Sequence, residues 1–144
     1  MNTTGDLIAI LLDIQAASGK NYIDKNRALL VSKVLGVPFS QLYDILTFYA
    51  MFNTEPKGEY VVEICQSAPC QFCEAQKVVN WFEAETGIKI GETDADGKIT
   101  LQRTSCVGAC DTGPAVKIGD TVFGGLDREK VKELVKHCRD GTLP

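Results

Sequence analysis

The chain has six cysteines, and four of them form two short-spaced pairs, Cys65 with Cys70 and Cys106 with Cys110. Four residues separate the members of the first pair, three separate those of the second, and 35 lie between the pairs. Short paired spacings of this kind bring thiolates from two loops onto one metal centre. A fifth cysteine, Cys73, lies so close to Cys70 that the same stretch of sequence supports a second interpretation.

A length of 144 residues allows one ordinary domain, or a small domain with a helical extension. The first part of the chain contains no basic segment, and Asp6 and Asp13 interrupt its apolar residues, so neither a signal peptide nor a membrane span is expected. We therefore expect a cytoplasmic protein without direct membrane insertion. In a reducing compartment, clustered cysteines are more often metal ligands or redox thiols than structural disulfides.

The charge and the motif content argue against several classes of function. The net charge is −4 and the lysines and arginines are scattered along the sequence, which argues against binding to nucleic acid or to a membrane surface. The chain also lacks a GxGxxG sequence, a Walker loop and a flavin-binding signature. It is therefore not expected to bind NADH by itself.

Three predicted helices occupy the first part of the chain, residues 1–54. Apolar residues recur at helical spacing from Asp6 to Ala17, and Asp24 can cap a second helix that ends at Gly36. Ser40 can cap a third helix, which runs to about Phe52 and is apolar around much of its circumference. Its aromatic residues fit core packing and a partner interface equally well: Phe48, Tyr49 and Phe52.

The pattern changes after the linker Asn53–Gly58 and predicts a small α/β domain over residues 55–144. Its predicted elements, in chain order, are a strand from Glu59 to Cys65, a helix from Gln71 to Thr86, a strand from Lys98 to about Arg103, a hairpin of Ala115–Ile118 and Thr121–Phe123, and a helix from Asp127 to about Cys138. This order predicts an α+β fold in which a three-helix unit precedes a four-stranded sheet with its helices.

One interpretation makes Cys65, Cys70, Cys106 and Cys110 the ligands of a [2Fe-2S] cluster. Four thiolates from two loops can hold such a cluster, two on each iron, if the loops leave room for backbone N–H groups to point at sulfur. Gly108 suits this close approach because it has no Cβ. A cluster held in this way makes the chain an electron carrier and requires no bond-making chemistry.

Spacing alone leaves three other uses of the cysteines open. Cys65, Cys70 and Cys73 with a distant fourth cysteine match the spacing of a plant-type ferredoxin, although Cys73 then falls at the start of a predicted helix. Cys70 and Cys73 also form a CxxC sequence at a predicted helix N-terminus, which is typical of a stand-alone thiol-disulfide oxidoreductase. Four cysteines can also form the structural zinc site of an interaction module.

Three segments carry a resemblance to a known family. They are CQSAPC (Cys65 to Cys70), CVGAC followed by DTGPAV (Cys106 to Val116), and LGVPFSQLYDILTFYAMF (Leu35 to Phe52). Together they resemble the thioredoxin-like [2Fe-2S] ferredoxin family. Its members include the small subunit beside the flavin subunit of respiratory complex I, and the matching subunit of NAD-linked and electron-bifurcating hydrogenases and formate dehydrogenases.

This resemblance implies that the four paired cysteines bind one [2Fe-2S] cluster in a thioredoxin-like domain. It implies a hetero-oligomer in which a partner subunit holds FMN and NAD(P) and exchanges single electrons with the cluster, and N-terminal helices that help to dock this partner. Many members have Gly-Thr-Ala before the second ligand, where this chain has Ser67, Ala68 and Pro69. Pro69 removes a backbone N–H that would otherwise be available to a sulfur atom.

The remaining candidates have simpler roles. Cys73 and Cys138 are expected to be small buried residues. His137 lies near the end of the last predicted helix, where it can interact favourably with the helix dipole. Pro114 precedes a predicted strand and fits either the cis proline common in thioredoxin-like folds or an ordinary trans proline. Two aromatic residues of the helix after the first cysteine pair are expected in the core: Trp81 and Phe82.

Overall fold

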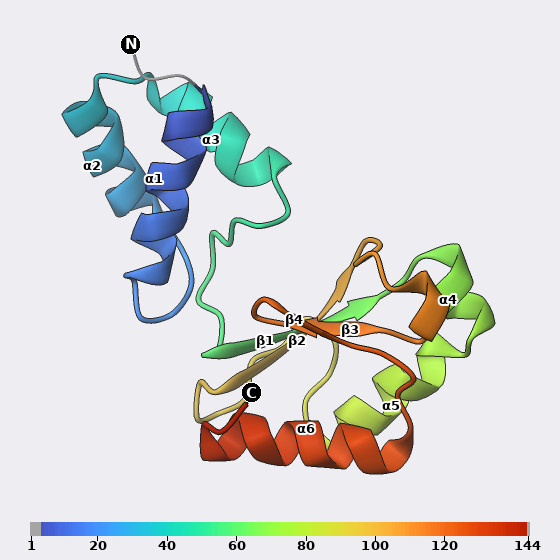
Figure 1. The fold of residues 1–144 in the computed structure, drawn as a ribbon. Helices are drawn as coiled ribbons and strands as arrows, with labels where there is room; N and C mark the ends of the chain where they lie inside the picture. Colours follow the sequence, from blue (N-terminus) through green and yellow to red (C-terminus); the bar gives the residue numbers. More distant parts are fainter. Residues whose placement is uncertain (1–3, 144) are drawn as a thin grey trace. The chain divides into compact units, whose positions relative to one another are not determined.

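The computed structural model describes residues 4–143, which divide into two compact units between Lys57 and Gly58 (Figure 1). The N-terminal unit contains three helices: α1 (Thr4–Ala16), α2 (Lys25–Leu35) and α3 (Phe39–Phe48). The C-terminal unit contains β1 (Tyr60–Cys65), α4 (Ala68–Phe72), α5 (Ala75–Thr86), β2 (Ile99–Thr104), the 3₁₀ turn η1 (Cys110–Thr112), β3 (Val116–Ile118), β4 (Thr121–Phe123) and α6 (Arg128–Asp140). The predicted fold class, three helices followed by an α/β domain with four strands, is confirmed.

The N-terminal unit has its own apolar core, and local chemistry sets the ends of its second helix. Asp24 caps α2, because its Oδ1 accepts a hydrogen bond from the backbone N–H of Arg27 at 2.8 Å. Gly36 ends α2 with a φ of 65°, in the left-handed region that favours glycine. The buried residues of this core come from all three helices, the segment before α2 and the segment after α3: Leu7, Leu11, Ile23, Ala28, Val31, Leu42, Ile45, Leu46 and Phe52.

The third helix differs from its prediction at both ends. It begins at Phe39 with Pro38 in the capping position, so Ser40 lies inside the first turn and does not cap the helix. The helix ends at Phe48 because Tyr49 adopts an extended conformation, and the backbone turns there instead of continuing to Phe52. A proline fits this start, since its fixed φ suits the entry to a helix and its missing N–H costs nothing there.

The sheet of the C-terminal unit has the strand order β2-β1-β3-β4. β1 and β2 are parallel, with Tyr60 opposite Ile99 and Cys65 opposite Thr104, and the α4–α5 segment makes the crossover between them. β3 pairs antiparallel with both β1 and β4. The turn between β3 and β4 contains Gly119 at a φ of 60°, as the predicted hairpin requires.

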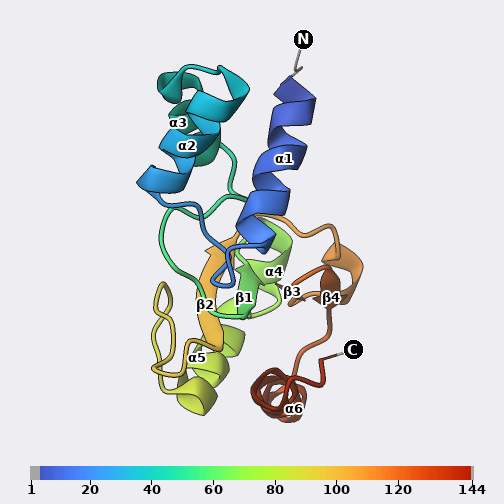
Figure 2. The ribbon, with the colours of Figure 1, turned by 90° about the vertical axis from the view of Figure 1, so that its left-hand side faces the viewer.

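Helices α5 and α6 pack together against one face of this sheet (Figure 1; Figure 2). The apolar core between them contains residues from three strands, both helices and the segment before α6: Val62, Ile64, Val78, Val79, Phe82, Ile99, Leu101, Val116, Ile118, Leu126, Val131, Leu134, Val135 and Cys138. Asp127 caps α6 as predicted, since its Oδ1 accepts from the N–H of Lys130 at 2.8 Å. Phe82 is fully buried and Trp81 packs against the same core, as expected.

The single helix predicted from Gln71 to Thr86 is wrong. The segment forms two helices, α4 and α5, because Glu74 adopts a left-handed conformation with a φ of 61° and interrupts the helical backbone. Cys73 is the C-terminal cap of α4 and is exposed, so the expectation that it is buried is also wrong. Cys138 is buried, as expected.

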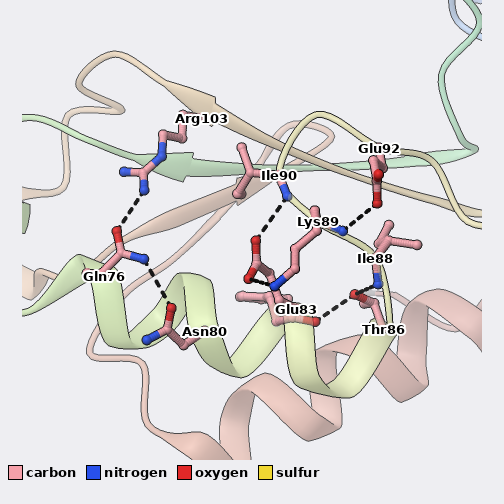
Figure 3. Close-up of polar contacts among 10 residues, drawn as sticks. Gln76, Asn80, Glu83, Thr86, Ile88, Lys89, Ile90, Glu92 and Arg103 are labelled. Carbon is pink, nitrogen blue, oxygen red and sulfur yellow. Dashed lines mark hydrogen bonds and ion pairs between the residues drawn. The ribbon is translucent and has the colours of Figure 1, made fainter.

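Polar contacts hold α5 to the segment that follows it and to β2 (Figure 3). Glu83 accepts hydrogen bonds from Lys89 Nζ at 2.9 Å and from the N–H of Ile90 at 3.2 Å, and both contacts lower the pKa of its carboxyl group. Arg103 of β2 donates to Gln76 of α5 at 2.7 Å. These contacts fix the helix relative to the strand that leads to the second cysteine pair.

None of the helices in residues 4–143 has the length and apolar character needed to span a membrane.

Candidate metal centre

The parallel pairing of β1 and β2 explains why cysteines far apart in sequence meet. Cys65 is the last residue of β1 and lies opposite Thr104, the last residue of β2. The next residue of the first loop, Gln66, donates its N–H to Thr104 O at 3.0 Å. Cys106 follows Thr104 by two residues. Both cysteine-containing loops therefore leave the same end of the sheet.

The first pair is buried. Cys65 and Cys70 are each 1% exposed and belong to a small apolar cluster with Ala75 and Ala115, against which Val107 and Ala109 pack. The backbone of Cys65 is held by the residue that precedes β3, since its N–H donates to Ala115 O at 3.1 Å. Cys70 lies in the short helix α4. This pair is therefore fixed by the core of the domain.

The second pair lies at the surface. Cys106 and Cys110 are both exposed, and their sulfur atoms are 3.6 Å apart. Gly108 between them has a φ of 84° and donates its N–H to Cys106 Sγ at 3.4 Å. The expected backbone donor at Gly108 is present, but no atom in the described part of the chain lies within 4 Å of an added Cβ. Its left-handed conformation, and not a close approach, is therefore the reason for glycine here.

Each pair contains one more acidic and one less acidic thiol. Burial raises the pKa of Cys65, but hydrogen bonds from the Ser67 hydroxyl and from the N–H groups of Ser67 and Val107 outweigh it and bring the pKa to about 7. Burial and the charge of Cys65 raise the pKa of Cys70. The Gly108 N–H, followed by the neighbouring thiol of the pair, lowers the pKa of Cys106, and Cys106 in turn raises that of Cys110.

The donor set suits a two-metal cluster. The charges of Cys65 and Cys70 both raise the pKa of Cys110, and that of Cys65 also acts on Cys106, so the two pairs share one electrostatic environment. Within the described part of the chain, no three or more His, Cys, Asp or Glu side chains are arranged to hold a single metal ion. Two cysteine pairs on adjacent loops match the two thiolates that each iron of a [2Fe-2S] cluster takes.

Cys73 lies outside the two pairs but close to the second loop. A Cβ added at Gly113 would come within 3.5 Å of Cys73 Sγ, so this thiol lies against the backbone that follows Cys110. Thiol exchange through Cys70 and Cys73 fits poorly, because Cys70 is buried and its pKa is raised, whereas a nucleophilic thiol needs exposure and a lowered pKa.

Two other predicted positions lie near or beyond this site. The Gly113–Pro114 peptide bond is cis, one of the two states expected for Pro114. His137 is in the last turn of α6, where the dipole favours a basic residue, and its Nδ1 lies 2.9 Å from Thr142 Oγ1.

Three aromatic residues of the helical unit were considered for a partner interface. Phe48 is 80% exposed, Tyr49 is half-buried, and Phe52 is 6% exposed within the helical core.

Sequence reasoning missed Ser67, whose hydroxyl oxygen lies 3.1 Å from Cys65 Sγ. In the sequence this residue stands out only as a difference from the Gly-Thr-Ala common in the family. Its position two residues after Cys65, a predicted ligand, was the available signal, but the direction of a hydroxyl depends on the loop conformation that α4 imposes.

The fold and the cysteine arrangement define a class: small α/β proteins with a thioredoxin-like domain in which two adjacent loops at one end of the sheet each carry a pair of cysteines. The sequence profile of the thioredoxin-like [2Fe-2S] ferredoxin family matches residues 2–139. The chain belongs to this family. It is accordingly an electron-transfer protein, and the cofactor typical of the family is a [2Fe-2S] cluster.

Two relatives share about a third of the aligned residues with this chain. A subunit of the NADH-quinone oxidoreductase of Rhizobium meliloti (strain 1021) is 35% identical over 109 residues, which are 76% of this chain and 65% of that protein. The NADP-reducing hydrogenase subunit HndA of Solidesulfovibrio fructosivorans is 31% identical over 131 residues, which are 91% of this chain and 75% of that protein. The chain thus spans less than two thirds of the first relative.

A crystal structure of an NAD⁺-reducing [NiFe]-hydrogenase in the air-oxidized state contains a similar fold. The TM-score is 0.77 with 20% sequence identity, and the match covers 92% of this chain but 23% of the hydrogenase chain. At this identity the similarity shows the fold alone. It includes the N-terminal helices, because the C-terminal unit by itself is shorter than the matched length.

Proposed function

We propose that this chain is the electron-transfer subunit of a multi-subunit NAD(P)-linked oxidoreductase, in which it exchanges single electrons with a flavin on a partner subunit. The observation that carries the proposal is the arrangement of two cysteine pairs on adjacent loops at one end of the sheet of a thioredoxin-like [2Fe-2S] ferredoxin. The chain itself is a carrier and performs no bond-making step.

The proposed ligands are Cys65, Cys70, Cys106 and Cys110. A [2Fe-2S] cluster bound there supplies reversible one-electron transfer. The protein contributes a buried anchor through the first pair and hydrogen bonds to sulfur from the Gly108 N–H and the Ser67 hydroxyl. Because the second pair is exposed, electrons enter and leave on the side of Cys106 and Cys110.

The proposed partner holds FMN and NAD(P). The relatives are named as subunits of an NADH-quinone oxidoreductase and an NADP-reducing hydrogenase, and this chain lacks the nucleotide-binding motifs that such chemistry needs. Residues 1–54 form the proposed docking region for this partner, with residues 55–144 as the electron-carrying domain. Within the proposed docking region, Phe48 is the most exposed aromatic residue that the structure describes. Tyr49 contacts its ring edge-on, with 5.0 Å between the ring centroids.

Iron and sulfide analysis with a visible absorption spectrum tests this function. Anaerobically purified protein should contain two irons and two sulfides per chain and show charge-transfer bands of a [2Fe-2S] cluster that bleach on reduction. A colourless protein with one zinc per chain would contradict the proposal and support a zinc-stabilised module. A tagged chain isolated from its own cells should retain a flavin-containing subunit, and its absence would contradict the partner assignment alone.

A further inference from the structure

Ser67 occupies the N-terminal capping position of α4, but its side chain does not cap the helix. Its backbone has the extended conformation of a capping residue, with φ −68° and ψ 158°, and its carbonyl accepts the first helical hydrogen bond from Gln71 at 3.0 Å. A capping serine normally accepts a hydrogen bond from the second or third N–H of its helix. No such bond to its hydroxyl is formed here.

Pro69 explains part of this departure. It is the second residue of α4 and has no N–H, so one of the two donors that a capping hydroxyl uses is missing. The Ser67 hydroxyl turns instead to Cys65 Sγ, at 3.1 Å. The loop therefore exchanges a helix cap for a contact with a proposed cluster ligand.

The direction of this hydrogen bond follows from the chemistry of a bound thiolate. In the free chain either the hydroxyl or the thiol can donate. A cysteine that binds iron has lost its proton, so the Ser67 O–H becomes the only possible donor of this pair.

We propose that Ser67 is a positioning residue that sets the reduction potential of the cluster by donating a hydrogen bond to Cys65 sulfur. This inference rests on the proposed function. Reduction adds one electron and one negative charge to a site that already carries four thiolates, and a donor to sulfur stabilises the more negative state. Ser67 therefore makes the cluster easier to reduce.

The test is the reduction potential of the full-length, cluster-containing chain and of three variants, measured by spectroscopic redox titration. Ser67→Ala should lower the potential by an amount equivalent to about a tenfold change in the one-electron equilibrium, ~59 mV. Ser67→Thr keeps the hydroxyl and should restore most of the potential. Ser105→Ala is the matched control, since Ser105 adjoins Cys106 but is exposed and makes no hydrogen bond to sulfur in the described residues.

A second measurement separates this role from a structural one. Resonance Raman bands of the Fe–S bonds should shift on transfer to D₂O, and the part of the shift due to Ser67 should be missing in Ser67→Ala and present in Ser67→Thr. Because the hydroxyl does not cap α4, the alanine variant should retain its thermal stability.

The outcomes are distinct. A normal cluster spectrum with an unchanged potential in Ser67→Ala overturns the inference and leaves the proposed function intact. Equal potential shifts in Ser67→Ala and Ser67→Thr also overturn it, because the hydroxyl is then irrelevant. A wild-type chain without iron and sulfide overturns both.

Discussion

The two sulfurs of each cysteine pair differ in their environment. Cys65 and Cys106 receive hydrogen bonds that lower their pKa. Burial raises the pKa of Cys70, and the neighbouring thiol of Cys106 raises that of Cys110. Metal binding requires thiolates, so in each pair the thiol whose pKa is lowered loses its proton at a lower pH than its neighbour does. The residues around the sulfurs thus favour stepwise deprotonation within each pair.

Replacing Cys110 with serine should abolish or strongly alter the cluster, while Cys73→Ser should leave its spectrum and iron content unchanged. The physical reason is position: Cys110 is 3.6 Å from Cys106, whereas Cys73 caps α4 and its sulfur lies against the backbone at Gly113. Iron analysis and electron paramagnetic resonance of the reduced proteins check this. The reverse result would support the plant-type ligand set instead.

Stability at high pH should depend on Cys138. Burial raises the pKa of this thiol from 9.0 to about 11, so the folded state holds the proton more tightly than the unfolded state. Its contribution to folding is fully present below pH 9 and is lost as the pH rises from 9 to 11. The loss is about 2–3 kcal/mol over this range.

Urea unfolding at about pH 8 and about pH 11, on either side of this range, measures the contribution. The wild-type chain should lose more stability between these values than Cys138→Ala, since both proteins share every other titrating group. Equal losses would show that Cys138 does not titrate as described.

At the level of elements, the proposed metal site depends on how the turn η1, which contains Cys110, is held. The O atom of Thr112 in η1 accepts a hydrogen bond from the N–H of Gly125, just beyond β4. A Cβ added at Gly124 would come within 2.7 Å of that same oxygen and closer still to the Thr112 side chain. Glycine at this position therefore allows β4 and η1 to approach.

Gly124→Ala should destabilise the chain by about 1–3 kcal/mol, because the extra methyl overpacks this contact. It should also lower cluster occupancy, since η1 carries Cys110. Gly119→Ala is the matched control: its left-handed φ of 60° costs ~1 kcal/mol, but its Cβ meets nothing within 4 Å in the described part of the chain and the cluster should be unaffected. Thermal unfolding and the ratio of cluster absorbance to protein distinguish the two variants, and equal occupancy would contradict the role of Gly124.

The elements that sequence predicted well are those with local signals. Asp24, Gly36 and Asp127 mark helix ends because capping chemistry depends on a few neighbouring residues. The break at Glu74 carried no such signal, since a left-handed glutamate is stabilised by its surroundings and not by its type. The exposure of Cys73 follows from that break, so it was equally hidden.

The candidate site was predictable in composition but not in geometry. Spacing and family resemblance selected four cysteines, and the parallel register of β1 and β2 explains why they meet. The contact of Ser67 with sulfur, and the burial of one pair beside the exposure of the other, depend on tertiary packing. Cysteine spacing alone contains no information on either feature.

The whole molecule consists of two units, each with an apolar core of its own. In the helical unit, α3 contributes its buried residues to the core and leaves large side chains exposed at its end. Phe48 is 80% exposed and Met51 is 49% exposed. Large exposed apolar side chains are common in contact surfaces.

Phe48→Ser should weaken binding to the flavin-containing partner by roughly tenfold or more, as expected of an aromatic anchor, while stability stays within about 0.5 kcal/mol. Leu30→Ser is the matched control, because Leu30 is 62% exposed on α2 of the same unit. Titration of the purified partner with each variant measures the affinity. An equal effect of both substitutions would argue against a specific interface at Phe48.

The unequal burial of the two cysteine pairs also determines which thiols of the metal-free chain are oxidised first. A peroxide in solution reaches Cys106 and Cys110 directly, and these thiols can give up two electrons and two protons as an S–S bond forms between sulfurs that start 3.6 Å apart. Cys65 and Cys70 are shielded from the same reagent. Peptide mapping after mild peroxide treatment of the apoprotein should therefore find the first crosslink in the surface pair, and a chain damaged in this way should not take up iron until a reductant reopens that bond.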